Sequence, residues 1–310
     1  MQAPLAVSTS GSTAGEHSLR NLSLGSHMSL ARHGEGPTAA LEAFGSQIHP
    51  VFMLPPVAAS AFGAVLAVDF ALDLAVLHMA TAFCALYVAH VKDGYVDFHL
   101  RGEDDDHPLS ARGCRVGLAG ASVVFFAGCL ALGVVVDPLA ALLTLPGWVI
   151  GYLHAPQLDL HPVGATAGYP AGIGIALLGG FYVQTSTLTL PVVAYAAVFT
   201  TILCGIKTVD DATDYAYDRS IGKRTVAVVL GRRGARRLAH LLMLAGMAAV
   251  VLLSAVGVFP TAAAGASVVF GAVLAVARRA DAKRATMLLI RGSYLFLAVL
   301  VVAAWLRPLG

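Results

Sequence analysis

Long apolar stretches recur along the chain from residue 49 to its end, and short polar or charged segments separate them. A helix needs roughly 20 apolar residues to cross about 30 Å of hydrocarbon, and these stretches are near that length. The pattern therefore predicts an all-α, polytopic membrane protein, a bundle of about nine transmembrane helices. The predicted helices cover residues 50–68, 72–97, 115–136, 138–155, 163–183, 189–210, 237–258, 261–277 and 285–306.

Residues 1–45 have a different character from the rest of the chain. They are rich in Ser, Gly, Ala and His and show little apolar periodicity. They also lack the continuous apolar run behind a basic start that marks a secretory signal peptide. We therefore expect residues 1–45 to form a flexible tail, and residues 46–310 to form one transmembrane domain.

The overall composition supports a membrane protein. Hydrophobic residues make up 57% of the chain and charged residues only 12%, with a mean hydropathy of +0.76. A soluble domain carries about 25% charged residues, so this chain has about half the usual share. The four cysteines show no paired spacing, and most lie within apolar runs. We therefore expect neither a disulfide framework nor a cysteine metal site.

The lysines and arginines predict the orientation of the helices. If the amino terminus is cytoplasmic, 18 of the 20 Lys and Arg residues lie on the cytoplasmic side of the nine predicted helices. The exceptions are Arg291, inside the last helix, and Arg307, near the far end. Cytoplasmic loops are enriched in Lys and Arg. The distribution therefore favours nine crossings of the cell membrane, with the amino terminus and the loops after helices two, six and eight in the cytoplasm.

The acidic residues are also unevenly distributed, because ten of the 18 lie in residues 93–106 and 210–218. Asp93 and Asp97 are four residues apart at the end of the second predicted helix, and so are Asp214 and Asp218 beyond the sixth. Side chains four residues apart share one face of a helix. The spacing predicts two pairs of neighbouring carboxylates on the same side of the membrane, and Asp211 joins the second pair.

Such carboxylate pairs favour a bound cation. Like charges this close repel one another, and ionised groups at a membrane boundary are costly unless a cation compensates them. Mg²⁺ commonly takes one or two carboxylates and completes its coordination shell with water and substrate phosphate oxygens. Two carboxylate pairs with Lys and Arg nearby therefore predict a Mg²⁺-dependent diphosphate site. The acids at 103–106, in a loop bounded by Gly and Pro, are instead expected to be a solvated surface.

The second acidic segment and its surroundings resemble a known family. Residues 211–219 and the following residues 222–231 are similar to the second aspartate motif of the UbiA superfamily of intramembrane prenyltransferases and the segment behind it. Residues 152–156, Tyr-Leu-His-Ala-Pro, resemble the tyrosine and proline stretch of that family, and His49-Pro50 stands where the family often has Lys-Pro. The resemblance covers roughly residues 46–310 in helix number and motif order.

The first acidic segment departs from the family pattern. Its usual motif is Asn-Asp-x-x-x-Asp or Asn-Asp-x-x-Asp, whereas here Asp93 stands in the asparagine place and Gly94 follows it. Asp in place of Asn keeps an oxygen ligand and adds charge. The tyrosine stretch is often followed by a lysine in the family, and Pro156 occupies that position here.

The resemblance implies an isoprenyl diphosphate as donor, a lipophilic acceptor, Mg²⁺ as cofactor and a site capped on the cytoplasmic side. Membrane lipids are the expected surroundings, and no nucleic acid is expected as a partner. The predicted metal carriers, which are also the predicted catalytic residues, are Asp93, Asp97, Asp214 and Asp218, with Asp211 as a further metal ligand. The predicted diphosphate ligands are Lys207, Arg219, Lys223 and Tyr152.

Aromatic and histidine side chains near the same face have secondary roles in this prediction. Aromatic faces stabilise cations in dry sites, so Tyr95, Tyr152 and Tyr215 are candidates to stabilise an allylic carbocation. His90, His154 and His161 show no paired spacing. We expect packing or interfacial hydrogen bonds from these histidines.

The sequence leaves three functions open. The first is prenyl transfer to a lipophilic acceptor. The second is a terpene cyclase on the same scaffold, with which the altered first motif is compatible. The third is a transporter or cation-binding membrane protein. A conduit is expected to place ionisable groups near the middle of the membrane, whereas the acids here gather at one face.

Overall fold

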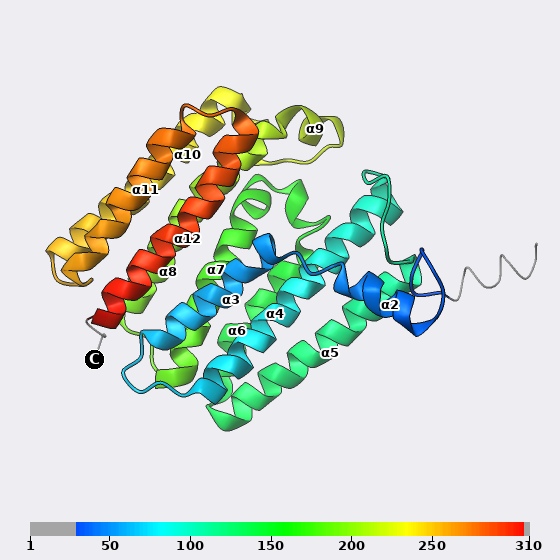
Figure 1. The fold of residues 1–310 in the computed structure, drawn as a ribbon, viewed down its shortest axis with the longest axis horizontal. Coiled ribbons are helices and arrows are strands. Elements are labelled where there is room, and N and C mark those ends of the chain that lie inside the picture. The colour runs from blue at the N-terminus through cyan, green and yellow to red at the C-terminus, as the bar shows by residue number, and fades with distance from the viewer. Residues whose placement is uncertain (1–28, 307–310) are drawn as a thin grey trace, which may run out of the picture.

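The computed structural model describes residues 29–306 and is all-helical apart from one isolated bridge between Ala31 and Leu109 (Figure 1). The longer helices run up and down as one bundle. The helices are α2 (Gly36–Gly45), α3 (Pro50–Val65), α4 (Leu72–Gly94), α5 (Ala111–Val135), α6 (Pro138–Leu153), α7 (Pro162–Thr185), α8 (Leu190–Thr213), α9 (Tyr215–Ser220), α10 (Val226–Ala255), α11 (Ala264–Ala277) and α12 (Ala282–Leu306). Three short elements join them: the π-helix η1 (Tyr95–Arg101) and the 3₁₀ turns η2 (Leu158–Leu160) and η3 (Thr261–Ala263).

Each of the nine predicted ranges overlaps an observed helix, but the number of membrane crossings is not settled by length and composition. Within residues 29–306, six helices are long and apolar enough to cross a membrane. A seventh is counted if α2 and α3, which meet at 66°, form one bent span. The helices α6 and η3–α11 are apolar but shorter. The chain is therefore a multi-pass membrane protein with at least six candidate spans.

Two predicted boundaries are wrong for local reasons. The predicted helix at 237–258 begins at Val226, because the side chain of Thr225 accepts a hydrogen bond from the backbone of Val228 and caps the helix. A kink at Gly231 (φ 69°) and the arginines after it hide this first part from an apolar pattern. The predicted helix at 72–97 continues to Arg101 through η1.

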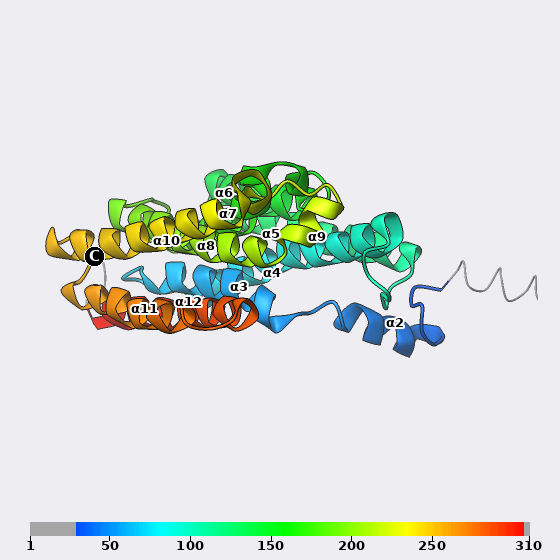
Figure 2. The same ribbon diagram turned by 90° about the horizontal axis from the view of Figure 1, so that it is seen from above.

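The expected tail at 1–45 includes a helix that the apolar pattern did not predict. Residues 1–28 lie outside the described part of the chain. Beyond them, the backbone N–H of Arg32 donates a hydrogen bond to the carbonyl oxygen of Pro108 at 2.8 Å. The Arg32 guanidinium forms an ion pair with the Asp106 carboxylate at 2.6 Å. Helix α2 follows and lies beside the main bundle rather than within it (Figure 2). Residues 29–45 are therefore attached to the loop before α5.

The largest apolar core joins α3 and α7 to α8, α10, α11 and α12. Tyr195 stacks on Phe259 with ring centroids 3.9 Å apart, and Phe62 meets Tyr195 edge-on. Helix α3 lies unusually close to α7 at Gly63. A Cβ atom at this position would fall 2.0 Å from the carbonyl oxygen of Leu177. Small residues at helix contacts allow such approach in membrane proteins.

A Pro-Pro pair at 55–56 interrupts the hydrogen bonding of α3. Proline has no N–H, so the carbonyl four residues earlier loses its helical partner. The two freed carbonyls, those of Val51 and Phe52, accept hydrogen bonds from the hydroxyls of Tyr294 on α12 (2.5 Å) and Tyr169 on α7 (2.7 Å). These bonds hold the beginning of α3 between α7 and α12, where it borders the cavity described below.

Candidate active site

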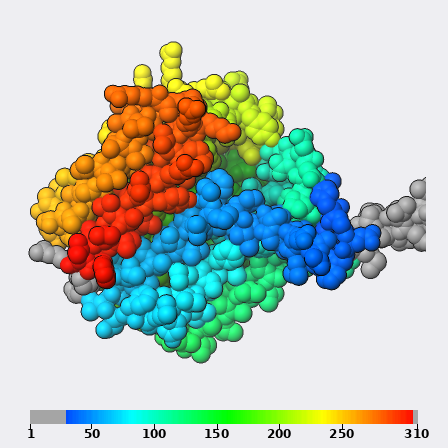
Figure 3. Space-filling view, in the orientation of Figure 1, coloured from blue at the N-terminus to red at the C-terminus, as the bar shows by residue number. Residues whose placement is uncertain are grey.

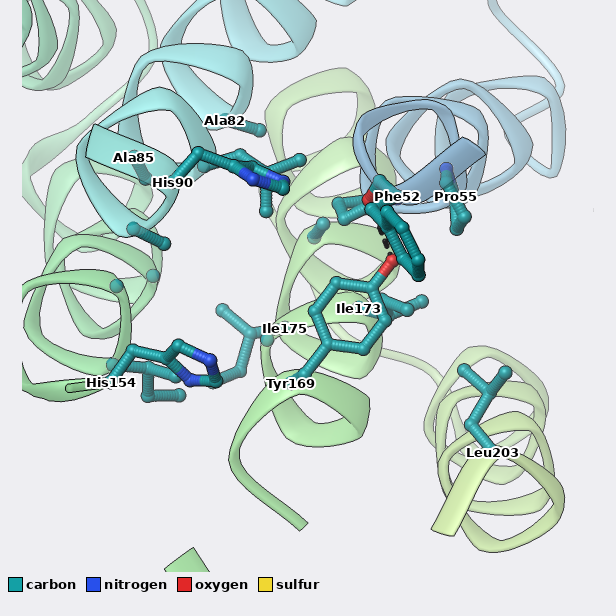
Figure 4. A pocket seen from close by; sticks show the side chains of 18 of the residues that line it. Phe52, Pro55, Ala82, Ala85, His90, His154, Tyr169, Ile173, Ile175 and Leu203 are labelled. Carbon is teal, nitrogen blue, oxygen red and sulfur yellow. Dashed lines mark hydrogen bonds between the residues drawn. The ribbon is translucent and has the colours of Figure 1, made fainter. Parts of the chain in front are cut away.

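A cavity of about 460 Å³ lies inside the bundle, between α3, α4, α6, α7, α8 and α12. Its walls are mainly apolar, with small residues such as Ala82 and Ala85 and larger ones such as Ile173 and Ile175 (Figure 4). The surface is hollowed between the beginning of α3, α12 and the end of α4 (Figure 3). Such a space suits an elongated apolar ligand.

Charged groups border this cavity at the end of α4 and in the last turns of α8. Asp93 of α4 and Lys207 and Asp210 of α8 are lining residues. We call this charged end the mouth of the cavity. It includes the neighbouring short elements η1, η2 and α9 and the loops that follow η1 and α9. Two of these residues belong to the two acidic segments that the sequence singled out, so the fold brings the segments to one place.

The first acidic segment crosses from α4 into the π-helix η1, with Asp93 in the former and Asp97 in the latter. Single π-turns are rare and often mark functional sites. Arg101, at the end of η1, lies between three carboxylates, those of Asp97 (3.4 Å), Glu103 (3.3 Å) and Asp159 (3.2 Å). The segment therefore carries its own cation, which also contacts Asp159 from the turn η2 after α6.

Glu103 corrects the expectation that residues 103–106 are all solvated. Asp104 and Asp105 are exposed, but the Glu103 side chain is only 6% exposed and contacts both Arg101 and Lys223 at 3.3 Å. The chain turns back at Gly102, whose φ of +64° is readily adopted by glycine. This turn directs Glu103 toward the mouth, which residue composition could not reveal.

The second acidic segment is held by ion pairs within α8. The Lys207 ammonium contacts Asp211 at 2.6 Å and Asp210 at 3.0 Å, four and three residues further along the helix. Asp211 is buried, and its other oxygen accepts a hydrogen bond from Thr166 of α7 at 2.7 Å. Both Asp211 oxygens are thus engaged in the structure.

Asp214 and Asp218 lie just beyond α8. Asp214 is exposed and Asp218 is buried in α9, where it accepts a 3.4 Å hydrogen bond from the Thr225 hydroxyl. Burial, and then the neighbouring carboxylate of Asp211, raise the pKa of Asp218 to about 6. Burial and Asp210 likewise raise the pKa of Asp214. The mouth holds more negative charge than its own cations neutralise, which favours a further cation.

Contacts between distant loops join the two segments. Lys223, from the loop after α9, reaches Glu103 across 120 residues of sequence. The backbone N–H of Arg224 donates to the carbonyl of Asp159 at 2.9 Å. Burial alone would lower the Lys223 pKa, but nearby carboxylates, led by Asp97, outweigh it and raise that pKa. Lys223 is therefore a permanent positive charge between the segments.

Two predicted diphosphate ligands contact other groups. Tyr152 is not among the residues that line the cavity; its ring stacks on Trp148 at 5.0 Å and lies under the Lys92 ammonium. Arg219 is exposed and contacts the hydroxyl of Tyr215 at 3.4 Å. Arg101, Glu103 and Asp159 were not predicted as site residues, because their only signal in the sequence is that they are charged residues on the same side of the bundle.

The donor set fits Mg²⁺ through oxygen ligands supplied from two sides. Among the described residues, no three His, Cys, Asp or Glu side chains form a ready-made metal cage. Mg²⁺ does not require one, because it commonly binds one or two carboxylates together with water and substrate phosphates. The carboxylates that could hold it are those of Asp93, Asp97, Asp214 and Asp218.

The protein is a multi-pass helical bundle with an apolar cavity and a charged mouth. Residues 53–300 match the model of the UbiA prenyltransferase family. The chain belongs to the UbiA prenyltransferase family. A comparison with curated proteins yields no match.

Solved structures show the same fold. The apo structure of a UbiA homolog from Aeropyrum pernix K1 aligns with a TM-score of 0.64 and 19% identity, over 82% of this chain and 97% of that chain. A digeranylgeranylglyceryl phosphate synthase aligns with a TM-score of 0.67 and 14% identity, over 86% and 98%. A UbiA homolog from Archaeoglobus fulgidus bound to GPP and Mg²⁺ aligns with a TM-score of 0.60 and 14% identity, over 86% and 99%.

Proposed function

We propose that this protein is a Mg²⁺-dependent prenyltransferase that moves an isoprenyl group from a prenyl diphosphate to a lipophilic acceptor. The observation that carries the proposal is the meeting of the two acidic segments at one end of an apolar cavity. An isoprenyl diphosphate has a matching division into a charged head and an apolar chain. The homolog bound to GPP and Mg²⁺ supports the same class of donor.

In this proposal the chain's own residues hold and orient the donor. Asp93, Asp97, Asp214 and Asp218 would bind Mg²⁺, which when bound supplies Lewis-acid stabilisation of the charge on a departing pyrophosphate. Asp211 keeps Lys207 at the mouth and would reach a metal only after giving up one of its two contacts.

The diphosphate oxygens need cationic partners as well. Lys207 lines the cavity and Lys223 lies between the two segments, so both are placed to bind a diphosphate. Arg101 joins them, because its guanidinium lies at the same mouth beside Asp97. Arg219 and Tyr152, predicted from the sequence for this role, would first have to leave their present contacts.

We also propose nine crossings with the amino terminus and the mouth on the cytoplasmic side, and residues 46–310 as the transferase domain. The asymmetric distribution of Lys and Arg supports this orientation. Cysteine labelling of single-cysteine variants at Asp105 and Ser186, on loops at opposite ends of α5–α7, tests it. A membrane-impermeant reagent should modify position 105 only after the cytoplasmic face is exposed.

Membranes carrying the protein, given geranylgeranyl diphosphate and Mg²⁺, provide the test of function. We expect Mg²⁺-dependent release of pyrophosphate and a lipid product whose mass is the sum of donor and acceptor. A product of donor mass alone would instead identify a cyclase. No pyrophosphate release over a panel of donor chain lengths would contradict both enzymatic functions and favour cation binding or transport.

A further inference from the structure

Besides His78, three histidines line the cavity, each at a different place in the fold. His49 precedes α3, His90 lies in the last two turns of α4, and His154 follows α6. All three line the cavity, and the rings of His90 and His154 point into it (Figure 4). The ring centroids of His49 and His90 are 5.4 Å apart. The fold thus gathers imidazoles that the sequence separates by more than a hundred residues.

Hydrogen bonding separates these histidines from the other histidines in residues 29–306. The remaining six all have a hydrogen-bond partner for a ring nitrogen: His33, His78, His99, His107, His161 and His240. No ring nitrogen of His49, His90 or His154 has a partner within the described part of the chain. A polar ring that lacks a partner and faces a cavity is available to a ligand.

The position of His90 along the axis of α4 places it near the carbon that would react. Asp93 is three residues further along α4, so His90 lies about 4.5 Å deeper along the helix axis. A diphosphate held at the level of Asp93 places its first isoprenyl carbon just below itself, on the apolar side. His90 is therefore at the depth where an allylic cation would form and where a new bond would be made.

Three other polar side chains that line the cavity, Asp93, Asp210 and Tyr169, have other roles or partners. Asp210 is paired with Lys207 at 3.0 Å, and the hydroxyl of Tyr169 donates to the carbonyl of Phe52. Asp93, one turn away, is assigned to the metal in the proposed function. A neutral imidazole has a basic ring nitrogen that can take up a proton from a bound acceptor.

We propose that His90 is the proton acceptor of the reaction, with His49 and His154 placed to pass the proton toward the mouth. This inference rests on the proposed function. The C–O bond of the prenyl diphosphate breaks, and its electron pair leaves with pyrophosphate. The acceptor's electron pair forms the new bond to the first isoprenyl carbon, and the acceptor's proton moves to a ring nitrogen of His90. Without an acceptor, the allylic cation loses a carbon-bound proton to His90 and becomes an alkene.

The purified, detergent-solubilised full chain can test this with geranyl diphosphate and Mg²⁺, both with 4-hydroxybenzoate as a probe acceptor and without any acceptor. Pyrophosphate, coupled product, C10 alkenes and C10 alcohols are quantified together. His90→Gln keeps a polar side chain of similar size but removes the basic nitrogen. His240→Gln, on α10 and outside the cavity, is the matched control.

In His90→Gln we expect coupled product and alkene, each relative to pyrophosphate, to fall at least ~10-fold, because a positioned base typically contributes about 10²–10⁴-fold. Pyrophosphate release should stay within about threefold of wild type, with water capturing the cation as alcohol. His154→Gln should show a smaller fall, and His240→Gln none. Retained pyrophosphate release also shows that the variant is folded.

Three results would overturn the proposal. The first is an unchanged ratio of product and alkene to pyrophosphate in both His90→Gln and His154→Gln. The second is a parallel loss of pyrophosphate release in His90→Gln, which would make the residue structural or donor-binding. The third is a wild-type protein that releases pyrophosphate but forms neither alkene nor coupled product. A wild-type protein that releases no pyrophosphate would instead contradict the proposed function.

Discussion

The two acidic segments reach the same mouth by different kinds of structure. In the second segment, Lys207 pairs with acids three and four residues away on its own helix, so the charges are arranged by local helical geometry. In the first, Arg101 pairs with Asp97 four residues earlier, but it also contacts Asp159 and the loop carboxylate of Glu103. The first segment therefore depends on how η1 and two loops fold together, whereas the second is largely preassembled.

This difference explains why the two motifs are unequally visible in the sequence. A locally assembled motif must keep its spacing, and residues 211–219 do resemble a known pattern. A motif assembled by tertiary contacts can exchange its charges among several loops. The first segment has such tertiary partners, and it is the segment in which Asp93 and Gly94 replace the family's usual residues.

The largest expected effect comes from removing a carboxylate of the second segment. Asp214→Ala or Asp218→Ala should lower turnover by at least ~100-fold, since loss of one electrostatic contact to a transition state typically costs 10²–10³-fold. The control is Asp105→Ala, an exposed acid that should keep wild-type turnover. Pyrophosphate release is the measurement, and similar rates in all three variants would remove the metal assignment.

Loss of Arg101 should harm the first segment through more than one contact. Arg101→Met leaves three neighbouring carboxylates without their shared cation, and we expect a loss of about 1–3 kcal/mol in stability. Thermal unfolding in detergent gives the measurement. In the double variant Arg101→Met with Asp159→Asn, part of this loss should be recovered, because one uncompensated charge is removed. Strictly additive effects would show that the two side chains do not interact.

Acidification should weaken metal binding through the second segment. Because the pKa of Asp218 is raised to about 6 in the metal-free protein, protons compete with Mg²⁺ as the pH falls from 7 to 5. The apparent affinity for Mg²⁺, measured by the Mg²⁺ dependence of pyrophosphate release, should decrease over this range.

The same raised pKa has the opposite effect on the stability of the metal-free protein: acidification weakens Mg²⁺ binding but increases the stability that this group contributes. The ordinary aspartate pKa is about 4, so between pH 4 and 6 the folded state binds more protons than the unfolded state. Stability from this group therefore decreases as the pH rises through that window. Asp218→Asn should remove this contribution, and an unchanged pH dependence of thermal unfolding in that variant would contradict the assignment.

The smallest expected effect on turnover concerns the contact of the second segment with a neighbouring helix. Thr166→Val removes the hydroxyl that donates to Asp211 but leaves the Lys207 ion pairs in place. A single hydrogen bond to a charged group contributes about 1.5–3 kcal/mol, so we expect reduced stability with activity within about tenfold of wild type. A loss as large as that of Asp218→Ala would show that the second segment also depends on tertiary contacts.

Much of the fold was predictable because membrane helices are long and apolar. All nine predicted ranges overlap helices, from 50–68 to 285–306. The pattern could not predict α2, which has only 10 residues, or the first part of α10 before its arginines. It also could not decide which helices cross the membrane, because α6 and α11 are shorter than a span.

The site was predictable only in part. Composition and spacing predicted the acids of both segments as site residues, because clustered carboxylates are conspicuous in a chain with 12% charged residues. They did not identify Glu103, which a turn at Gly102 directs inward, and they placed Tyr152 in a role that its stacking on Trp148 does not suit. Neither orientation could be predicted, because the direction of a side chain from a loop or helix end depends on the backbone around it.

The sequence by itself determined that the chain is a helical membrane protein with two clusters of acids, since hydropathy and i,i+4 spacing are local properties. Only the tertiary structure decided which charges meet. Lys223 and Glu103 are 120 residues apart, and His49, His90 and His154 come from separate elements. Such contacts depend on how helices pack and how their loops turn, and no local pattern along the chain encodes them.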